Sequence, residues 1–211
     1  MLPGPLQKND NFPFECLTCG ECCSGTMEVF LNPMDVIILA KHLKMNNTKD
    51  LWEDGYIVTA GGQNGTLIPR LKFAGLSPGF CPFVVNNWDE ETSCLKGTCS
   101  IHGKAKPLIC RLAPIAREVD LDENEEEYFL KEPVIGCPGC KEQTEVNVGS
   151  YVETLGPELD LEKRWFTLLK TGLDRKVSPE DMLKKFFYIE LPADPAKLMT
   201  EWEKDPLFSC C

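Results

Sequence analysis

Cysteines are the residues of this sequence best suited to chemistry, and four of its twelve lie within eight positions. The stretch FECLTCGECCSGT, residues 14–26, holds Cys16, Cys19, Cys22 and Cys23. Thiolates three residues apart can wrap one face of a small cluster, so that each meets a different iron atom. Gly20 and Gly25 relax the backbone, which lets its N–H groups point at sulfur. This loop therefore predicts a site for a soft metal ion or an iron–sulfur cluster.

The spacing C-x2-C-x2-C also begins the ferredoxin motif, in which a remote fourth cysteine is followed by proline. Both Cys81-Pro82 and Cys137-Pro138 offer that pair. The adjacent Cys23 departs from a plain ferredoxin. We expect it to face a second site, because neighbouring side chains rarely reach the same small cluster.

Zinc is the main alternative to an iron–sulfur cluster. A zinc ion takes four ligands in a tetrahedron, often from two C-x2-C pairs, which are called knuckles. Cys16/Cys19 and Cys137/Cys140 are two such pairs, but their separation is far longer than in a usual zinc ribbon. Cys99 and His102 add a further pair. Soft thiolates would also accept copper(I), which ranks lower.

Other uses of the cysteines are disfavoured. A nucleophilic thiol needs a histidine base, and only His42 and His102 exist. We expect His42 to lie on the surface of a helix, and no third residue that would orient His102 is evident. A chain of 211 residues does not need disulfides to fold. For the terminal pair Cys210-Cys211 we slightly favour free thiols over further ligands or a prenylation site.

Composition and charge bound the setting of the protein. The first residues, MLPGPLQKNDNFPF, have no cationic and apolar leader pattern, so we expect a cytoplasmic protein with reduced thiols. The net charge of −11 argues against binding to nucleic acid or anionic membranes. No apolar run is long enough to span a bilayer. The acidic residues 120–127 are predicted to form a solvated turn between two strands.

The elements that position the cysteines predict an α+β fold. We expect a small, irregular, cysteine-rich metal-binding domain with short strands, followed by a helical C-terminal region. The domain boundaries predicted from composition are residues 1–13 for an N-terminal arm, 14–140 for the cysteine-cluster domain and 141–211 for a helical region that packs on it.

Local signals place the individual elements. Asn32, Pro33 and Asp35 predict the start of a helix that runs to about Met45. Thr48 is predicted to cap a short helix. Glycines between residues 56–60 and 66–73 predict a hairpin rather than a nucleotide-binding loop, since no helix follows them. Further strands are predicted at 80–85, 115–119 and 128–130, and helices at 159–169, after Ser178 and after Asp194.

The whole constellation resembles the YkgJ-like cysteine-cluster family, a proposed zinc- or iron-chelating domain with the pattern CxxCxxCC. The family pattern is F-x-C-x-x-C-G-x-C-C, an aspartate-led helix, C-P-F, C-x-I-Y, R-P-x-x-C-R and a late cysteine. The matching residues here are Phe14 to Cys23, Asp35, Cys81-Pro82-Phe83, Cys99-Ser100-Ile101-His102, Lys106-Pro107 through Cys110-Arg111, and Cys137. His102 replaces the usual tyrosine, and Lys106 replaces an arginine.

The resemblance implies a set of eight metal ligands, which is enough for two four-cysteine sites. These ligands are Cys16, Cys19, Cys22, Cys23, Cys81, Cys99, Cys110 and Cys137. Arg111 is expected to bind around the cofactor, where it would donate hydrogen bonds or offset thiolate charge. We favour an iron–sulfur cluster of the 4Fe–4S type, with zinc as the alternative.

Three functions follow from this ligand set. The favoured one is a redox or accessory role, with a protein partner that is a redox partner or a modification target. The second is a structural zinc-binding adaptor. The third is an enzyme, because the family also includes a flagellin lysine N-methylase that uses S-adenosylmethionine. We find no glycine-rich methyl-donor loop and no C-x3-C-x2-C radical signature, so the methylase reaction is not transferred.

Overall fold

Antiparallel strand pairs, rather than one continuous sheet, carry the β-structure of this computed structural model. The structure describes residues 4–24, 27–75, 79–90 and 93–209, without the side chains of residues 63, 94 and 95. Its contacts define two compact units, each built from two segments of the chain. Unit 1 comprises Met1–Glu28 and Phe73–Gly156, and unit 2 comprises Val29–Lys72 and Pro157–Cys211. Short strand pairs and a helical C-terminal region confirm the predicted α+β class.

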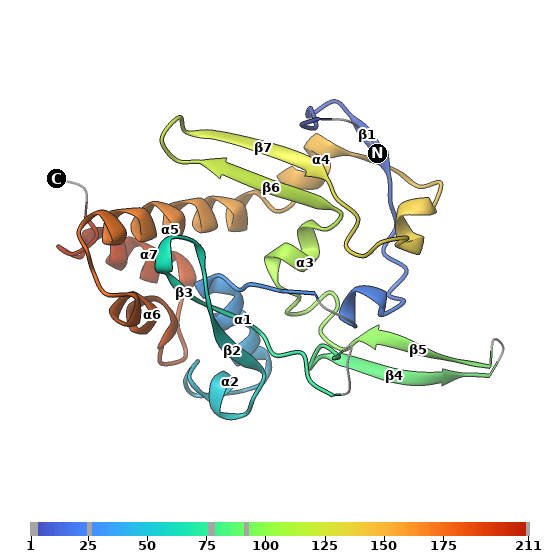
Figure 1. Cartoon of the computed structure of the whole chain (residues 1–211), viewed down its shortest axis with the longest axis horizontal. Coiled ribbons are helices and arrows are strands. Elements are labelled where there is room, and N and C mark those ends of the chain that lie inside the picture. The colour runs from blue at the N-terminus through green and yellow to red at the C-terminus, as the bar shows by residue number, and fades with distance from the viewer. Residues whose placement is uncertain (1–3, 25–26, 76–78, 91–92, 210–211) are drawn as a thin grey trace. The chain divides into compact units, whose positions relative to one another are not determined.

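Unit 1 contains the cysteine-rich segments and two β-hairpins, β4–β5 and β6–β7 (Figure 1). Its elements are β1 (Asn11–Pro13), the 3-10 helix η1 (Glu21–Cys23), β4 (Val84–Asp89), β5 (Cys94–Cys99), α3 (Leu108–Leu112), β6 (Ile115–Asp120), β7 (Glu125–Leu130), the 3-10 helix η3 (Pro138–Lys141), β8 (Glu145–Asn147) and α4 (Val148–Glu153).

The pair β1–β8 joins segments that are far apart in the sequence. Phe12 stands opposite Val146 in this antiparallel pair, and Pro13 stands opposite Glu145. Phe12 is fully buried, and its ring meets that of Tyr151 edge-on at 5.8 Å between centroids. Burying a phenylalanine side chain contributes about 1.5–3 kcal/mol. The last three residues of the predicted arm therefore form a strand with a buried anchor.

The acidic run 120–127 joins two strands, as predicted, but the turn itself is shorter, because Asp120 ends β6 and Glu125 already begins β7. Strand β6 ends at Asp120, and its carboxylate accepts the backbone N–H groups of Asp122 at 2.8 Å and Glu123 at 3.0 Å. Arg117 on β6 donates to the Glu126 carboxylate on β7 at 2.8 and 3.0 Å. The turn is thus held by its own side chains, and most of its acidic residues face solvent.

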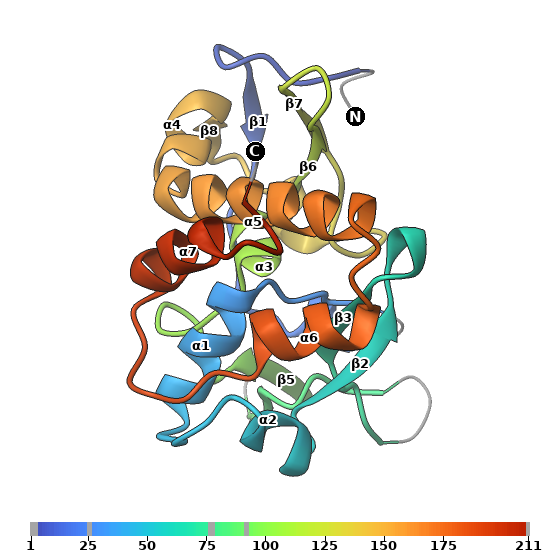
Figure 2. The same cartoon turned by 90° about the vertical axis from the view of Figure 1, so that its left-hand side faces the viewer.

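Unit 2 consists of helices and one hairpin, β2–β3, which lies at one side of them beside α6 (Figure 2). Helix α1 contacts α2, α6 and α7, and α6 contacts β3. Its elements are α1 (Pro33–His42), α2 (Asp50–Glu53), β2 (Ile57–Gly61), the 3-10 helix η2 (Gln63–Gly65), β3 (Leu67–Leu71), α5 (Gly156–Asp174), α6 (Pro179–Phe187) and α7 (Pro195–Lys204).

Aromatic side chains fill the core of unit 2. Phe186 on α6 is fully buried and lies 4.9 Å from the ring of Phe208 and 5.2 Å from that of Trp202, between centroids. Trp165 meets Phe187 edge-on at 5.7 Å. All of these aromatic side chains are buried, so they pack the core of unit 2.

The predicted helix starts are present. The Asn32 side chain accepts the N–H of Asp35 at 2.9 Å, and the Asp35 carboxylate accepts that of Asn32 at 3.2 Å, which completes a capping box. Ser178 caps α6 by accepting the N–H of Asp181 at 3.1 Å. Asp194 caps α7.

Two local predictions are wrong. Thr48 does not cap α2, whose first flanking residue is Lys49. Instead Thr48 is buried, and its hydroxyl donates to the carbonyl of Phe187 at 2.6 Å and accepts the N–H of Ile189 at 2.8 Å. The strand predicted at 80–85 begins only at Val84 and continues to Asp89, because its partner is the unpredicted strand β5.

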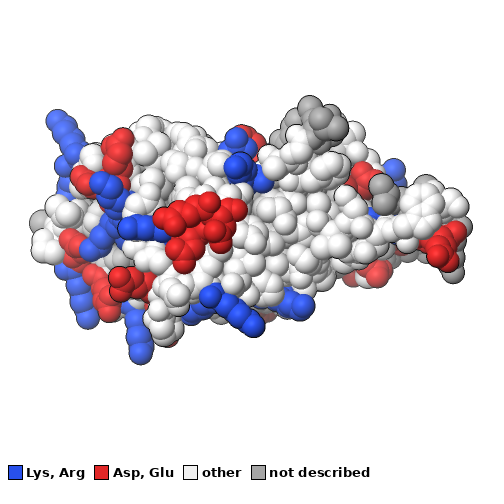
Figure 3. All heavy atoms as spheres, turned by 90° about the horizontal axis from the view of Figure 1, so that it is seen from below, with Lys and Arg blue, Asp and Glu red and all other residues white. Residues whose placement is uncertain are grey.

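The surface carries both signs of charge. On the face drawn in Figure 3, acidic and basic side chains lie intermixed, so the net charge of −11 does not form one uniform acidic surface there. Among the described residues, no helix combines the length and apolar character needed to cross a membrane.

Candidate metal centre

The cysteine loop is fixed to the β4–β5 hairpin by its backbone. Cys22 and Cys23 lie on η1, which contacts β5. Gly20 precedes η1 with a φ of 77° and packs against Gly97 on β5. The N–H of Cys81 donates to the carbonyl of Cys23 at 2.8 Å. The loop, the segment before β4 and the end of β5 therefore meet at Cys23.

Four thiols from these three segments form one group. The Cys23 thiol lies within hydrogen-bonding reach of the thiols of Cys22, Cys81 and Cys99. We call these four residues the Cys23 group. We expected Cys23 to face away from Cys22 into a second site, but the fold of η1 brings the two adjacent thiols together. Cys81 is buried, and the other three are half-buried.

Protons are distributed unevenly within the Cys23 group. Hydrogen bonds from Cys23 lower the pKa of Cys22 and of Cys99 to about 6, and the positive charge of Lys106 contributes to both shifts. A hydrogen bond from Cys23 also lowers the pKa of Cys81. The same hydrogen bonds raise the pKa of Cys23. Because the thiolate is the form that binds metals, the lowered pKa values favour the ligand form of Cys22, Cys81 and Cys99, whereas the raised pKa of Cys23 favours its thiol.

Backbone N–H groups also point at these sulfur atoms. The N–H of Phe83 donates to the sulfur of Cys81, and the N–H groups of Ile101 and His102 donate to that of Cys99. Such N–H···S bonds orient thiolate ligands and tune the reduction potential of iron–sulfur clusters. The imidazole of His102 is exposed, as is that of His42 on α1.

A second set of cysteines lies around η3. The Cys140 thiol forms a hydrogen bond with that of Cys137, and Cys137 is buried. Burial and then the charge of Cys137 raise the pKa of Cys140 to about 12. The pKa of Cys19 is raised mainly by burial, and the charges of Cys22 and Cys137 add to that shift. Cys19 therefore lies near both Cys22 of the Cys23 group and Cys137.

Cys16 and the helix α3 occupy the same unit. The Tyr151 hydroxyl donates to the carbonyl oxygens of Arg111 at 2.7 Å and Ala113 at 2.8 Å. Burial and then the charge of Cys16 raise the pKa of Tyr151 to about 12, so Cys16 lies near this hydroxyl. Cys110 and Arg111 are half-buried on α3. We assign Cys110 to neither thiol group, and the predicted role of Arg111 stays a prediction.

The donor set fits a sulfur-preferring metal. None of the nine cysteines whose side chains the structure describes forms a disulfide. Within the described ranges, no three or more His, Cys, Asp or Glu side chains are grouped so that they could hold a metal ion as they stand. All four members of the Cys23 group offer soft sulfur, which suits zinc, iron–sulfur clusters or copper(I). Gly25, Cys210 and Cys211 lie outside the described residues.

Two residues of the site lie outside the predicted set of eight ligands and Arg111. Lys106 acts electrostatically on Cys22 and Cys99, and its place in the family pattern, where arginine is usual, was the signal. Cys140 contacts Cys137, and its C-x2-C spacing was the signal.

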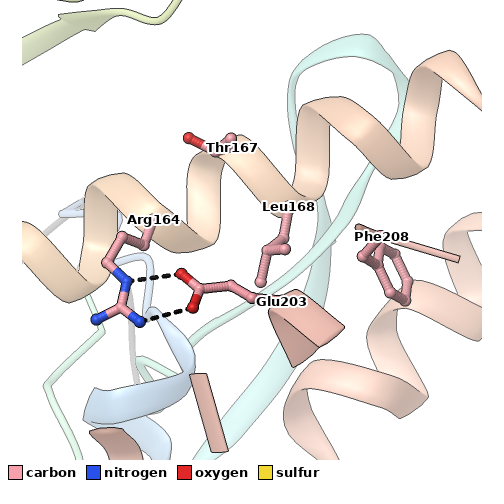
Figure 4. Close-up of a pocket in the computed structure, with 5 residues that line it drawn as sticks. All are labelled: Arg164, Thr167, Leu168, Glu203 and Phe208. Atoms are coloured by element: carbon pink, nitrogen blue, oxygen red, sulfur yellow. Dashed lines mark hydrogen bonds and ion pairs between the residues drawn. The ribbon is translucent and has the colours of Figure 1, made fainter. Parts of the chain in front are cut away.

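A separate pocket lies in unit 2, and none of its described lining residues is a cysteine (Figure 4). It has a volume of about 300 Å³ and is lined by Arg164, Thr167, Leu168, Glu203 and Phe208. The Arg164 guanidinium forms a two-pronged hydrogen bond with Glu203, at 2.7 and 2.8 Å. Its lining residues supply no thiol or imidazole for a metal.

Comparison with known proteins agrees with the cysteine pattern. A family model named CxxCxxCC, described as a proposed zinc- or iron-chelating domain, matches residues 15–138. No curated protein and no solved structure matches the chain. The matched segment covers more than half of the 211 residues and contains all four members of the Cys23 group. The chain therefore belongs to the CxxCxxCC family of zinc- or iron-chelating domains.

Proposed function

We propose that this protein holds an iron–sulfur cluster, of the 4Fe–4S type, at the Cys23 group and serves a redox or accessory role. One observation carries the proposal. The thiol of Cys23 lies within reach of three other thiols that come from η1, from the segment before β4 and from the end of β5. Four sulfur donors, here from three segments, are the number of ligands that such a cluster requires.

The surroundings of the Cys23 group support a charged cluster. Lys106 offsets the negative charge of the thiolates, and the backbone N–H groups of Phe83, Ile101 and His102 orient two of the sulfur atoms. When bound, a cluster would supply one-electron transfer. The chain itself supplies the ligands, the compensating charge and the hydrogen bonds that set the potential.

Zinc is the second candidate at the same group, since four thiolates also satisfy a structural zinc ion. In that case the protein is an adaptor without redox chemistry. Both candidates require reduced thiols, so we place the protein in the cytoplasm. For either candidate we propose a protein partner, as a redox partner or a modification target.

Metal analysis of the protein purified without oxygen tests the proposal. We expect iron and sulfide in near-equal amounts and a brown absorption band that dithionite bleaches. Cys23→Ser should abolish both the iron and the colour, whereas Thr98→Ser, a change of one methyl group on β5, should keep them. Zinc bound to the Cys23 group of a colourless protein, lost in Cys23→Ser, would overturn the cluster and establish the adaptor.

A further inference from the structure

Two C-x2-C knuckles that are distant in the sequence lie together in unit 1. The first is Cys16/Cys19 in the cysteine loop, and the second is Cys137/Cys140 on η3. Their separation in the sequence argued against one zinc site. The fold removes that objection, because β1 pairs with β8 and leads directly into the first knuckle.

Backbone hydrogen bonds continue this pairing beyond the strands. The N–H of Phe14 donates to the carbonyl of Thr144 at 2.9 Å, and the N–H of Glu15 donates to that of Gly139 at 3.0 Å. The Thr144 hydroxyl donates to the Glu15 carboxylate at 2.9 Å. Cys16 is the next residue after Glu15, and Cys140 is the next after Gly139. The hydrogen bond between Glu15 and Gly139 therefore holds the two knuckles together directly beside Cys16 and Cys140.

The close approach of the two segments depends on a glycine. A β-carbon added at Gly139 would lie 2.2 Å from the carbonyl oxygen of Glu15, which no side chain could tolerate without a backbone shift. Gly139 is buried and lies inside the second knuckle, between Cys137 and Cys140. The chain thus keeps a residue without a side chain where the two knuckles touch.

The thiols of this region also interact with one another. Cys140 and Cys137 share a hydrogen bond between their thiols, and the carbonyl of Cys137 accepts the N–H of Cys140 at 3.2 Å. The charge of Cys137 acts on Cys19 of the other knuckle. The charge of Cys22 acts on Cys19 as well, so Cys19 also lies near the Cys23 group.

We propose that Cys16, Cys19, Cys137 and Cys140 form a second, distinct site that binds a single zinc ion. Cys140 lies beyond the residues that the family model matches, and it takes the place of Cys110, the fourth ligand that the family resemblance would imply beside Cys16, Cys19 and Cys137. Two C-x2-C knuckles on separate segments are the usual ligand set of structural zinc. This inference rests on the proposed function in one respect: the four cysteines of the Cys23 group are taken to bind the cluster and are therefore not ligands of the zinc ion.

The proposed zinc ion has a structural task. Bound between the knuckles, it would tie the segment after β1 to the segment before β8. Each of the two anchored segments would supply two thiolates to the ion. Four thiolates around one divalent ion carry a net charge of −2, and a zinc ion has no redox chemistry.

Metal stoichiometry of matched variants tests the second site. Protein purified without oxygen in the presence of zinc is analysed for zinc, iron and sulfide, as wild type, Cys140→Ser, Cys23→Ser and Thr98→Ser. We expect Cys140→Ser to lose one zinc ion per chain and to keep its iron and sulfide. Cys23→Ser should lose iron and sulfide and keep that zinc ion, and Thr98→Ser should change nothing. Loss of iron in Cys140→Ser, or unchanged zinc, would overturn the second site.

The outcomes separate this inference from the proposed function. A wild-type protein with one zinc ion that depends on Cys140 but without iron would keep the second site and reject the cluster. A wild-type protein with iron and sulfide but without zinc would support the cluster and reject the second site. If Cys140→Ser fails to fold, hydrogen exchange of the wild-type protein decides. Removal of zinc by a chelator should speed exchange at the amides of Phe14 and Glu15 and leave that of Glu118 on β6 unchanged; equal exchange with and without zinc would reject the site.

Discussion

Gly20 and Gly97 lie in direct backbone contact, so that a β-carbon added at Gly20 would come 2.5 Å from the carbonyl oxygen of Gly97. The contact joins the cysteine loop to β5, two residues before Cys22 on one side and two residues before Cys99 on the other. Neither segment could approach the other as closely with a larger residue. This pair of glycines therefore sets how near the thiols of η1 and β5 lie.

Gly20→Ala should disrupt the Cys23 group. The substitution adds a backbone clash to the strain of a positive φ, which alone costs about 1–2 kcal/mol. Gly103→Ala is the matched control, since Gly103 also has a positive φ, of 69°, but open space around it. We expect Gly20→Ala to weaken metal retention against a chelator by about tenfold or more relative to Gly103→Ala, which corresponds to about 1.4 kcal/mol. Equal retention by the two variants would show that the glycine contact does not position the thiols.

Cys23→Ala should raise the pKa values of its neighbours in the metal-free protein. Hydrogen bonds from Cys23 are the largest cause that lowers the pKa of Cys22 and Cys99 to about 6. A lowered pKa favours the thiolate, so the wild-type protein should gain ultraviolet thiolate absorbance as the pH rises through about 6. In Cys23→Ala this step should move toward the ordinary value of 9.0. An unmoved step would contradict the assigned hydrogen bonds.

Lys106→Gln should shift the same titration in the same direction by a smaller amount. The positive charge of Lys106 lowers the pKa of Cys22 and Cys99, but it ranks behind the hydrogen bonds as a cause. Lys104→Gln is a matched control, because Lys104 is exposed two residues away. A thiolate titration of the metal-free variants would measure both shifts. If Lys104→Gln shifted the thiolate titration as far as Lys106→Gln, the shift would come from the net charge of the protein and not from the location of Lys106 near the thiols.

Elements encoded by neighbouring residues could be predicted from the sequence. The capping box of Asn32 and Asp35 and the Ser178 cap act over three residues, and their helices begin where expected. The β2–β3 hairpin follows from its glycine-rich turn. The prediction that Thr48 caps α2 was wrong because its hydroxyl bonds to the backbone of Phe187 and Ile189, about 140 residues away. No pattern among neighbouring residues indicates such a distant partner.

The sequence could not predict which cysteines lie together, for the same reason. Spacing identified sulfur ligands and their family, but which thiols meet depends on the pairing of β1 with β8 and of the cysteine loop with β5. A linear division at residues 13 and 140 stays a prediction about domains. The contacts instead group the chain into units that each combine two separate segments, which composition along the chain does not reveal.

Phe186→Ala should strongly destabilise unit 2. Phe186 is fully buried between Trp202 and Phe208, and truncation of a buried phenylalanine costs about 3–5 kcal/mol. Leu207→Ala is the control, since Leu207 is 55% exposed and should cost less than about 1 kcal/mol. Urea unfolding followed by tryptophan fluorescence measures both. If Phe186→Ala lowered the free energy of unfolding by less than Leu207→Ala, Phe186 would not be a core residue.

The pair Arg164–Glu203 should make a small contribution to stability that depends on pH and salt. The guanidinium lowers the pKa of Glu203 below its ordinary value of 4.5. Because the pKa is lowered in the folded state, the stabilisation is complete above pH 4.5 and is lost as the pH falls through the folded value. Both side chains are about one-third exposed, so solvent screening limits the contribution to about 0.2–1 kcal/mol. Glu203→Gln should therefore be less stable than wild type by that amount at neutral pH and low salt, and the difference should shrink at high salt and in acid. Glu201→Gln, an exposed glutamate on the same helix, is the control. A difference of several kcal/mol that persists at high salt would instead show that the ion pair is shielded from water.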